Sequence, residues 1–228
     1  MFDNDKFNKS CEWCRNMNKM YSVKESSLTF AEWCYRKSKA EAIEVIKEKI
    51  GEIIIEVKLL KYPKEEDWRF CKECALNTMG KKIVNNPNIE WKEAMLRAEH
   101  SPIRTLWFAF KLEIPYWVSV HLSRHKIGCE HFVQSQRDDR ANNDIPRSEK
   151  TQGEIVSHIL YINAQELIFM ARRRLCNQAS KETREAVYKM CYEVINVCPE
   201  FKDFLVPNCK YLGRCPEMYP CGKVDVNE

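Results

Sequence analysis

The sequence predicts an α+β fold, a small sheet with helices packed around it, from three observations. Segments rich in β-branched and alternating apolar residues, such as 53–60, have strand character. Segments with apolar residues at helical spacing lie between and after them, and this mixed order is typical of an α+β protein. The third observation is size, because 228 residues with 44% hydrophobic and 31% charged residues suffice for one main globular domain.

The first half of the chain contains several segments with a clear apolar pattern. Apolar residues recur at helical spacing within residues 30–50, and Gly51 is placed to end that helix. Tyr62-Pro63 stops the β-rich segment before it. The predicted elements are a helix over 30–50, a strand over 53–60, helices over 65–79 and 90–98 separated by a turn at 85–88, a strand over 106–110, and an apolar continuation over 114–120 after a bend at Pro115.

The second half is expected to begin with a polar loop over 138–152 and to continue as a long helical segment over 155–179. Six residues of that segment have the spacing of one buried face, namely Ile155, Ile159, Ile162, Leu167, Met170 and Leu175. Ser180 is a suitable N-cap for a second helix over 182–197.

The chain divides into three parts by composition. Residues 1–51 form an N-terminal extension with helical character and a Cys-x-x-Cys pair, Cys11 and Cys14. Residues 52–205 carry the main domain, and residues 206–228 form a tail rich in Pro, Gly and Cys. The sequence contains no internal repeat.

Charge and composition limit the class of protein. The net charge of +4 suits an anionic small molecule and is weaker than a dedicated nucleic-acid-binding protein usually shows, so nucleic acid is an unlikely partner. Charged residues interrupt the apolar runs before they reach the length of a membrane span, and no secretory signal is visible. Twelve cysteines without such a signal indicate a reducing compartment, and we expect a cytoplasmic protein.

Residues 121–140 concentrate basic and hydrogen-bonding side chains. Six cationic or titratable residues fall within seventeen positions, Arg124, His125, Lys126, His131, Arg137 and Arg140, with Gln134, Ser135 and Gln136 between them. Arginine forks bind phosphate oxygens in pairs, and Ser and Gln add neutral contacts. A solvated basic loop is the alternative, but the mixture of residue types favours a site for a phosphate-bearing ligand.

A second polar group follows in the predicted helix. Asn163 and Arg174 are eleven residues apart, so on a helix they lie about 20° from each other and can contact one elongated ligand. Arg172, Arg173 and Arg174 cannot all lie on one face, so at least one of them is expected to be a surface charge.

The cysteines suggest a metal site. Cys209, Cys215 and Cys221 are spaced evenly in the tail and, with Cys176 or Cys198, could bind zinc. Cys11, Cys14, Cys71 and Cys74 are a weaker second set, and free thiols are the alternative for both. Cys129 lies in the basic segment, where its thiolate would be favoured, so a nucleophile and a structural thiol are both open.

Four ordered motifs between residues 52 and 205 resemble those of the flavin-dependent thymidylate synthases. That family carries Arg-His-Arg, seven residues, Ser, and an Arg two positions later; this chain has Arg124-His125-Lys126, eight residues, and Ser135-Gln136-Arg137. Its Asn-Ala-Arg segment, with an Arg eleven residues after the Asn, is similar to Asn163-Ala164-Gln165 and Arg174. Residues 56–62 resemble its first strand, and residues 99–102 its His-Glu-Thr-Pro turn.

This resemblance implies a small, mainly antiparallel sheet with packed helices and a homotetramer whose flavin sites are built from several subunits. It implies transfer of a one-carbon unit from methylenetetrahydrofolate to C5 of dUMP, giving dTMP, with FAD as cofactor and NADPH as reductant. Arg174 and Ser135 would be catalytic, and both would bind the substrate with Gln134, Gln136 and Arg137. The cofactor-binding residues would be Arg124, His125, Lys126, Ser101, Asn163 and Gln165. Cys129 would be structural, because this family needs no cysteine nucleophile.

Two other functions stay open. The region between Arg137 and Asn163 is shorter than in typical members, and with the Lys126 departure it allows another pyrimidine nucleotide or a hydroxymethyl product. Arg140 and Arg147 are candidate replacements for the shortened region's nucleotide contacts. The Cys-x-x-Cys pairs and the positive charge suggest instead a zinc-stabilised module that binds nucleic acid.

Overall fold

The computed structural model describes residues 55–140 and 146–223, all within one compact unit that begins at Ile54. The predicted helix over 30–50, its cap at Gly51 and the Cys11–Cys14 pair lie outside the described residues. None of the described helices is long and apolar enough to cross a membrane.

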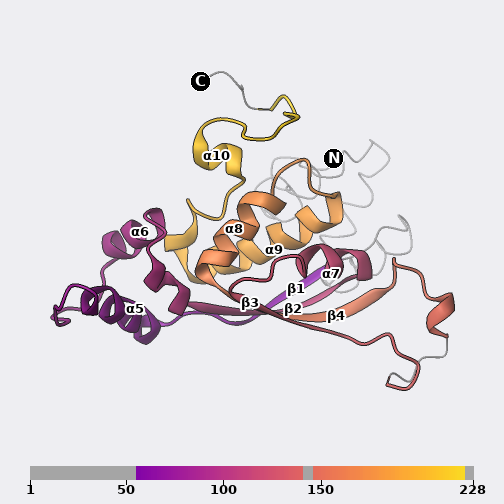
Figure 1. Ribbon diagram of the computed structural model, residues 1–228, viewed down its shortest axis with the longest axis horizontal. Coiled ribbons are helices and arrows are strands. Elements are labelled where there is room, and N and C mark those ends of the chain that lie inside the picture. The colour runs from indigo at the N-terminus through magenta and orange to yellow at the C-terminus, as the bar shows by residue number, and fades with distance from the viewer. Residues whose placement is uncertain (1–54, 141–145, 224–228) are drawn as a thin grey trace, which may run out of the picture. The chain divides into compact units, whose positions relative to one another are not determined.

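A four-stranded antiparallel sheet lies at the centre of this unit, in the order β1-β2-β4-β3 (Figure 1). The strands are β1 (Glu56–Lys61), β2 (Trp107–Pro115), β3 (Cys129–Val133) and β4 (Ile155–Asn163). The central strands β2 and β4 pair along their whole length, from Trp107 opposite Asn163 to Pro115 opposite Ile155. The predicted α+β fold with a small antiparallel sheet and packed helices is confirmed.

Alternate residues of the central strands face a helical layer. Helices α8 (Ala164–Arg174) and α9 (Lys181–Val197) lie above the sheet in the view of Figure 1. Buried on that side are Phe108, Phe110, Leu112 and Ile114 of β2 and Val156, His158, Leu160 and Ile162 of β4. The other face carries Trp107 stacked on Tyr161 and the exposed Phe132, Ile155 and Ile159. In the described residues no helix covers these apolar side chains.

Most of the helices predicted for the described residues are confirmed. They are α5 (Glu65–Asn77), α6 (Ile89–Arg97) and α9, and the Ser180 side chain caps α9 as expected. Trp68 of α5 packs on Phe201, which contacts Phe108 edge-on at 5.3 Å between ring centroids. The short elements are the 3₁₀ helices η2 (Ser101–Thr105), η3 (Arg147–Glu149) and η4 (Pro199–Phe201) and the helix α10 (Asn208–Leu212).

The strand predicted over 106–110 extends to Pro115, and the apolar continuation after the bend is helical, because residues Tyr116–Leu122 form helix α7. Pro115 ends β2 and occupies the N-cap of α7, a place where its missing N–H is harmless and its fixed φ suits the chain. The aromatic and β-branched residues that favour a strand are overridden here by the turn at the proline.

The long helix over 155–179 is wrong in its first third. Residues 155–163 form β4, and the helix begins only after Asn163, whose side chain accepts a hydrogen bond from the Glu166 amide at 3.0 Å. Ile155 and Ile159, assigned to the buried helical face, are 48% and 39% exposed. The buried set alternates instead with the period of two expected for a strand.

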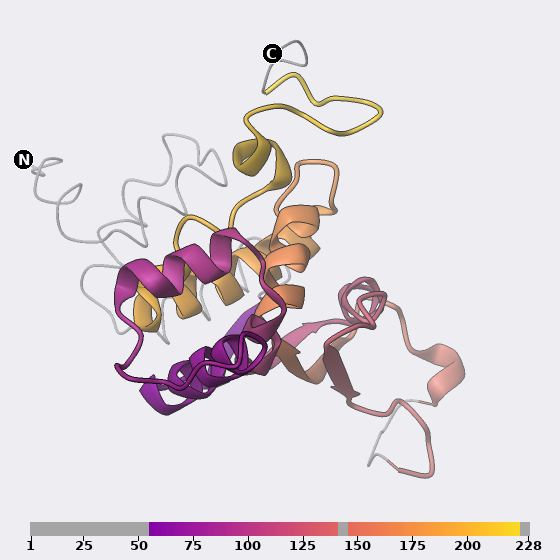
Figure 2. The ribbon, with the colours of Figure 1, turned by 60° about the vertical axis from the view of Figure 1, so that its left-hand side comes forward.

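The basic segment 121–140 is not a simple bend. It contains the end of α7, a tight turn at Gly128, and the edge strand β3, which is antiparallel to β4. Figures 1 and 2 both show the chain after β3 running away from α8. The part of this basic segment that follows β3 therefore lies away from α8 within one chain.

Candidate functional site

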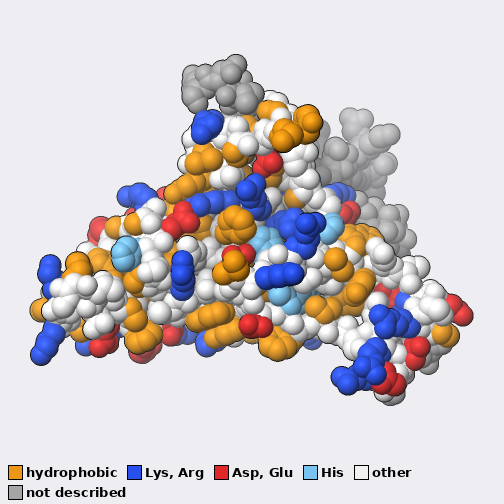
Figure 3. Space-filling model, in the orientation of Figure 1, with side chains coloured by type: hydrophobic (Ala, Val, Ile, Leu, Met, Phe, Trp, Pro, Cys, Tyr) orange, Lys and Arg blue, Asp and Glu red, His pale blue; other side chains and the backbone are white. Residues whose placement is uncertain are grey.

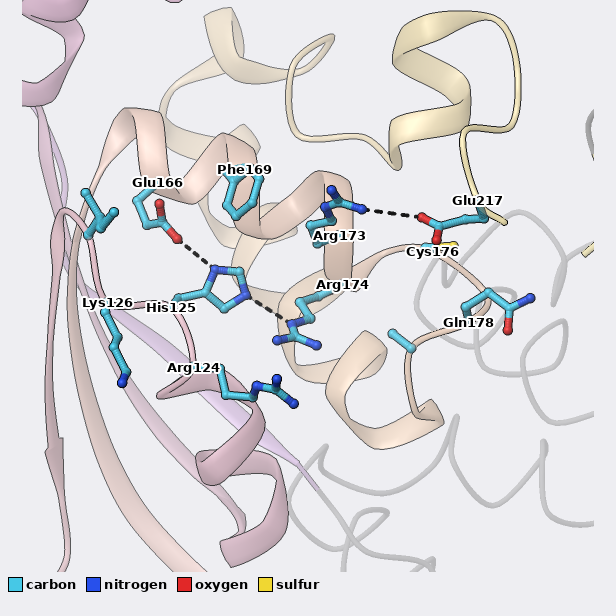
Figure 4. Close-up of a pocket in the computed structure, with 12 residues that line it drawn as sticks. Arg124, His125, Lys126, Glu166, Phe169, Arg173, Arg174, Cys176, Gln178 and Glu217 are labelled. Carbon is cyan, nitrogen blue, oxygen red and sulfur yellow. Dashed lines mark hydrogen bonds and ion pairs between the residues drawn. The ribbon is translucent and has the colours of Figure 1, made fainter. Parts of the chain in front are cut away.

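A pocket of about 560 Å³ lies between the turn after α7 and one face of α8 (Figure 4). Residues 124–127 form one wall, and Glu166, Phe169, Arg173 and Arg174 of α8 form the other. Residues that follow α8 and Glu217 of the C-terminal segment complete the rim. The volume is that of a site for one small molecule of nucleotide size.

Positive charge predominates in this pocket. Arg124, Lys126, Arg173 and Arg174 line it, against the two carboxylates of Glu166 and Glu217. Figure 3 shows Lys and Arg side chains gathered near the middle of this face of the molecule. Burial lowers the pKa of Arg174, and the nearby charges of Arg124 and Arg173 lower it further. An anion bound among these groups would relieve that repulsion.

The buried end of the pocket is a chain of three side chains, Glu166, His125 and Arg174. The Glu166 Oε1 lies 2.7 Å from His125 Nδ1, and Arg174 donates from Nε to His125 Nε2 at 3.0 Å. Because an arginine nitrogen can only donate, Nε2 is the acceptor and the ring proton lies on Nδ1. His125 is thus a neutral imidazole that donates to Glu166.

A close approach of two backbone segments sets this arrangement. The backbone N–H of Asn163 donates to the Gly128 carbonyl at 2.8 Å, and this hydrogen bond joins the turn after α7 to the start of α8. Gly128 has a φ of +74°, and a Cβ on it would lie 2.3 Å from Asn163 Nδ2. Only glycine suits this position on both grounds. The contact brings His125 opposite Glu166, three residues after Asn163.

Two side chains of β3, Cys129 and His131, fix the backbone of His125. Its carbonyl accepts from His131 Nε2 at 2.8 Å and from the Cys129 thiol at 2.9 Å. His131 Nδ1 is 3.0 Å from Nε2 of His158, which is fully buried. Burial lowers the pKa of His158 to about 4, with a further contribution from His131, so His158 is neutral near pH 7.

Cys129 is buried and does not line the pocket. Burial, together with the charges of Glu166 and Glu130, raises the pKa of its thiol to about 11. The sulfur therefore stays protonated near pH 7 and serves as a donor to the His125 carbonyl. This supports the interpretation of Cys129 as structural.

The structure brings four of the predicted site residues together, namely Arg124, His125, Lys126 and Arg174. The segment from Gln134 to Arg137 lies elsewhere, beyond the far end of β3. Gln134 exchanges hydrogen bonds with the Ser157 backbone, and Arg137 pairs with Asp139 at 2.6 Å. None of Gln134, Ser135, Gln136 and Arg137 lines the pocket of its own chain.

The remaining predicted cofactor residues also do not line the pocket. Asn163 is 6% exposed and is used as the cap of α8, with about 16 Å of helix between it and Arg174. Gln165 accepts from Arg104 Nε, and Ser101 begins η2 with its side chain exposed. The prediction that Asn163 and Arg174 contact one ligand from one helix face does not fit this placement.

Three pocket residues of α8 were not assigned to the site from the sequence, namely Glu166, Phe169 and Arg173. They recur at i, i+3 and i+7, which places them on one face of α8. This stripe is visible in the sequence only when Asn163 is recognised as the start of the helix. Phe169 is 46% exposed and presents an aromatic ring to the pocket. Glu217 reaches the rim from the C-terminal segment and lies 3.7 Å from Arg173.

Four cysteines line a second cavity, of about 230 Å³, near the end of α8: Cys176, Cys209, Cys215 and Cys221. These are the residues predicted to bind zinc. However, within residues 55–140 and 146–223 no group of three or more His, Cys, Asp or Glu side chains is placed to hold a metal ion. The thiols share a cavity without forming a coordination site, and zinc binding stays a prediction.

Comparison with known proteins identifies a structural relative. No family model and no curated protein sequence matches the chain. The crystal structure of the UMP/dUMP methylase PolB from Streptomyces cacaoi, bound with 5-Br dUMP, matches with a TM-score of 0.51 and 14% identity. The match covers 67% of this chain and 97% of PolB. The two proteins share a fold.

The Gly128 contact predicts an unequal response to two glycine substitutions. Gly128→Ala should destabilise the protein by about 1–2 kcal/mol from φ alone, and by more because Asn163 must move. Gly213 has a similar φ of +72° with nothing within 4 Å of an added Cβ, so Gly213→Ala is the matched control. Urea unfolding of both variants would measure the difference, and equal losses would contradict the role of the Asn163 contact.

The raised pKa of Cys129 predicts low reactivity towards alkylation. At pH 8, well below about 11, its thiol is protonated, so iodoacetamide should modify the exposed Cys221 far sooner. Cys129 should react only after urea is added. Peptide mass spectrometry of timed samples would follow both sites. Modification of the two cysteines at similar rates in the folded protein would contradict this assignment.

Proposed function

We propose that the protein is a pyrimidine-nucleotide methyltransferase that transfers a one-carbon unit from methylenetetrahydrofolate to C5 of dUMP with the help of a flavin. The observation that carries the proposal is the pocket described above, which joins three arginines, a lysine and an exposed aromatic ring. It occurs in a fold shared with a solved UMP/dUMP methylase. The order of motifs in the sequence points to the same chemistry.

The side chains of the pocket suit the two halves of a nucleotide. Guanidinium groups bind phosphate oxygens bidentately, and Arg124, Arg173 and Arg174 offer that geometry from two walls. The exposed ring of Phe169 offers a flat apolar surface for the pyrimidine. This combination of charge and aromatic surface favours a phosphorylated base over a simple anion.

The same charges suit the reaction. When C5 of the pyrimidine becomes nucleophilic, negative charge spreads onto the ring oxygens, and a fixed guanidinium stabilises it. Arg174 is positioned for this role because two hydrogen bonds hold its guanidinium. In the alternative chemistry a cysteine thiolate attacks the pyrimidine, and Cys129, protonated and outside the pocket, is unsuited to it.

The residues present fit a flavin in part. Arg124 and Lys126 line the pocket and are suited to the phosphates of FAD or to the carboxylates of a folate. His125 and Asn163 are engaged inside the protein, so a flavin would be held without them in this arrangement. FAD when bound would supply the hydride that completes the methyl group, and NADPH would reduce it again.

A second chain would supply what this pocket lacks. We expect a homotetramer in which the segment Gln134–Arg137 of one chain completes the pocket of another. The apolar face of the sheet, with Trp107, Tyr161, Ile159 and Phe132, is a surface of the kind that oligomers bury. This arrangement would bring Ser135 and Arg137 to the nucleotide, as the resemblance implies.

Arg174→Ala tests the nucleotide site directly. Loss of a charged hydrogen-bond donor should weaken dUMP binding about tenfold or more, with the melting temperature little changed. Arg97 is exposed on α6 and does not line the pocket, so Arg97→Ala is a matched loss of one arginine. Isothermal titration calorimetry measures both. If Arg174→Ala binds dUMP like the unchanged protein, the proposed site is wrong.

The product and the spectrum separate the alternative functions. Purified protein with FAD should show flavin absorbance and convert dUMP with isotope-labelled methylenetetrahydrofolate to labelled dTMP, as seen by mass spectrometry. A hydroxymethyl product, or turnover of another pyrimidine nucleotide only, would identify the alternative substrates. A colourless protein that binds oligonucleotides in a salt-dependent way would favour the nucleic-acid module and contradict the enzyme.

Zinc at the C-terminal cysteines remains part of the proposal, with a defined test. If zinc binds, the segment 207–223 must move so that Cys176, Cys209, Cys215 and Cys221 converge. Elemental analysis should then find about one zinc per chain, and Cys215→Ser should abolish it. Cys198 does not line this cavity, so Cys198→Ser should keep the metal. Absence of zinc from the unchanged protein would leave these residues as free thiols.

A further inference from the structure

We infer that His125 and Glu166 are positioning residues, which fix the fork of Arg174 in the pocket while no carboxylate of the described residues pairs with its charge. The inference rests on the proposed function, because it concerns how Arg174 meets the nucleotide. It starts from the contacts of three consecutive arginines of α8. Arg172 lies 2.7 Å from the Glu99 carboxylate, and Arg173 lies 3.7 Å from that of Glu217.

Arg174 is held differently. Its Nε donates to the imidazole of His125, and its Nη2 donates to the backbone carbonyl of His121, both at 3.0 Å. Both acceptors are neutral. Two of the five N–H bonds are used, and three remain on the two terminal nitrogens, which is enough for a bidentate contact with a phosphate or a pyrimidine oxygen. The guanidinium is thus oriented without losing its positive charge to a carboxylate.

Glu166 acts on Arg174 indirectly, through His125. Its carboxylate accepts from His125 Nδ1 at 2.7 Å and thereby keeps the proton on that nitrogen. The Nε2 lone pair is then free to accept from Arg174. In the other tautomer an N–H would face an N–H, and the hydrogen bond to Arg174 would be lost. A direct pairing of Glu166 with Arg174 would hold the arginine as well, but it would neutralise the group that should attract the ligand.

The placement of His125 fits positioning and not contact with the ligand. The residue is 6% exposed, and both of its ring nitrogens are engaged within the protein. A further pair of hydrogen bonds, from His131 and Cys129, fixes its carbonyl. Glu166 is also buried. The ligand would therefore meet Arg174 and not the imidazole.

Two substitutions of His125 separate positioning from packing. The Gln amide can place an oxygen near the former Nε2, so His125→Gln keeps an acceptor for Arg174 and loses the donor to Glu166. The Asn amide can place N–H near the former Nδ1, so His125→Asn keeps the donor to Glu166 and loses the acceptor for Arg174. Each variant loses one hydrogen bond, so a purely structural role predicts similar effects of both on stability and binding.

We expect His125→Asn to weaken dUMP binding about tenfold and His125→Gln to weaken it less than about threefold, with similar melting temperatures. In the Arg174→Ala background, His125→Asn should produce no further loss, because its effect passes through Arg174. Titration calorimetry measures all four affinities. Equal losses for the two His125 variants, or an additive loss in the double variant, would overturn the inference.

The tautomer provides a readout that needs no ligand. In ¹⁵N-histidine-labelled protein at neutral pH, NMR should show His125 protonated at Nδ1 alone. Glu166→Ala should remove that preference, and observation of an Nε2–H tautomer or an imidazolium in the unchanged protein would refute the inference.

If Arg174→Ala leaves dUMP affinity unchanged, the proposed function fails. If it weakens binding while the His125 variants behave alike, only the positioning roles fail.

Discussion

The contact between Gly128 and Asn163 is the constraint on which the pocket depends. It joins the turn after α7 to the residue where β4 ends and α8 begins. A left-handed φ and the absence of a Cβ allow the two backbones to meet there. The side chain of Asn163 also caps α8, so the same residue fixes the start of the helix and the position of the Gly128 turn beside it. His125 and Glu166 face each other as a consequence.

Arg174 shows how the fold keeps a charge available. Burial of a cation is unfavourable unless partners compensate for it, and carboxylates are the usual partners. Here the compensation comes from an imidazole and a carbonyl, while Arg124 and Arg173 add repulsion. The pocket thus has more positive than negative charge, since Arg124, Lys126, Arg173 and Arg174 line it against the carboxylates of Glu166 and Glu217. An anion bound there would lower the electrostatic free energy of these cations.

The sequence predicted elements correctly where a cap or a turn marks their start. It failed where the spacing of the apolar residues fits both a helix and a strand. Ser180 and the turn before α6 defined helix starts correctly. Within β4, by contrast, Ile155, Ile159 and Ile162 have the spacing of one helical face, so the segment was predicted as a helix. The buried strand position of His158 was not recognised because its side chain is polar. For the site, clustered charges identified the basic turn. Glu166 and Glu217 lie far from it in the sequence, so only the folded chain shows them as its neighbours.

The geometry of β3 decides how the rest of the predicted substrate site can act. The strand pairs Cys129 with Ile162 beside the pocket and Val133 with His158 further along β4. Each residue of an extended strand advances about 3.3 Å, so Ser135 lies roughly 20 Å from the Gly128 turn. Neither Ser135 nor Arg137 lines the pocket of its own chain. In the proposed homotetramer they would reach the nucleotide from a second chain, and the pairing of chains would then be part of the site.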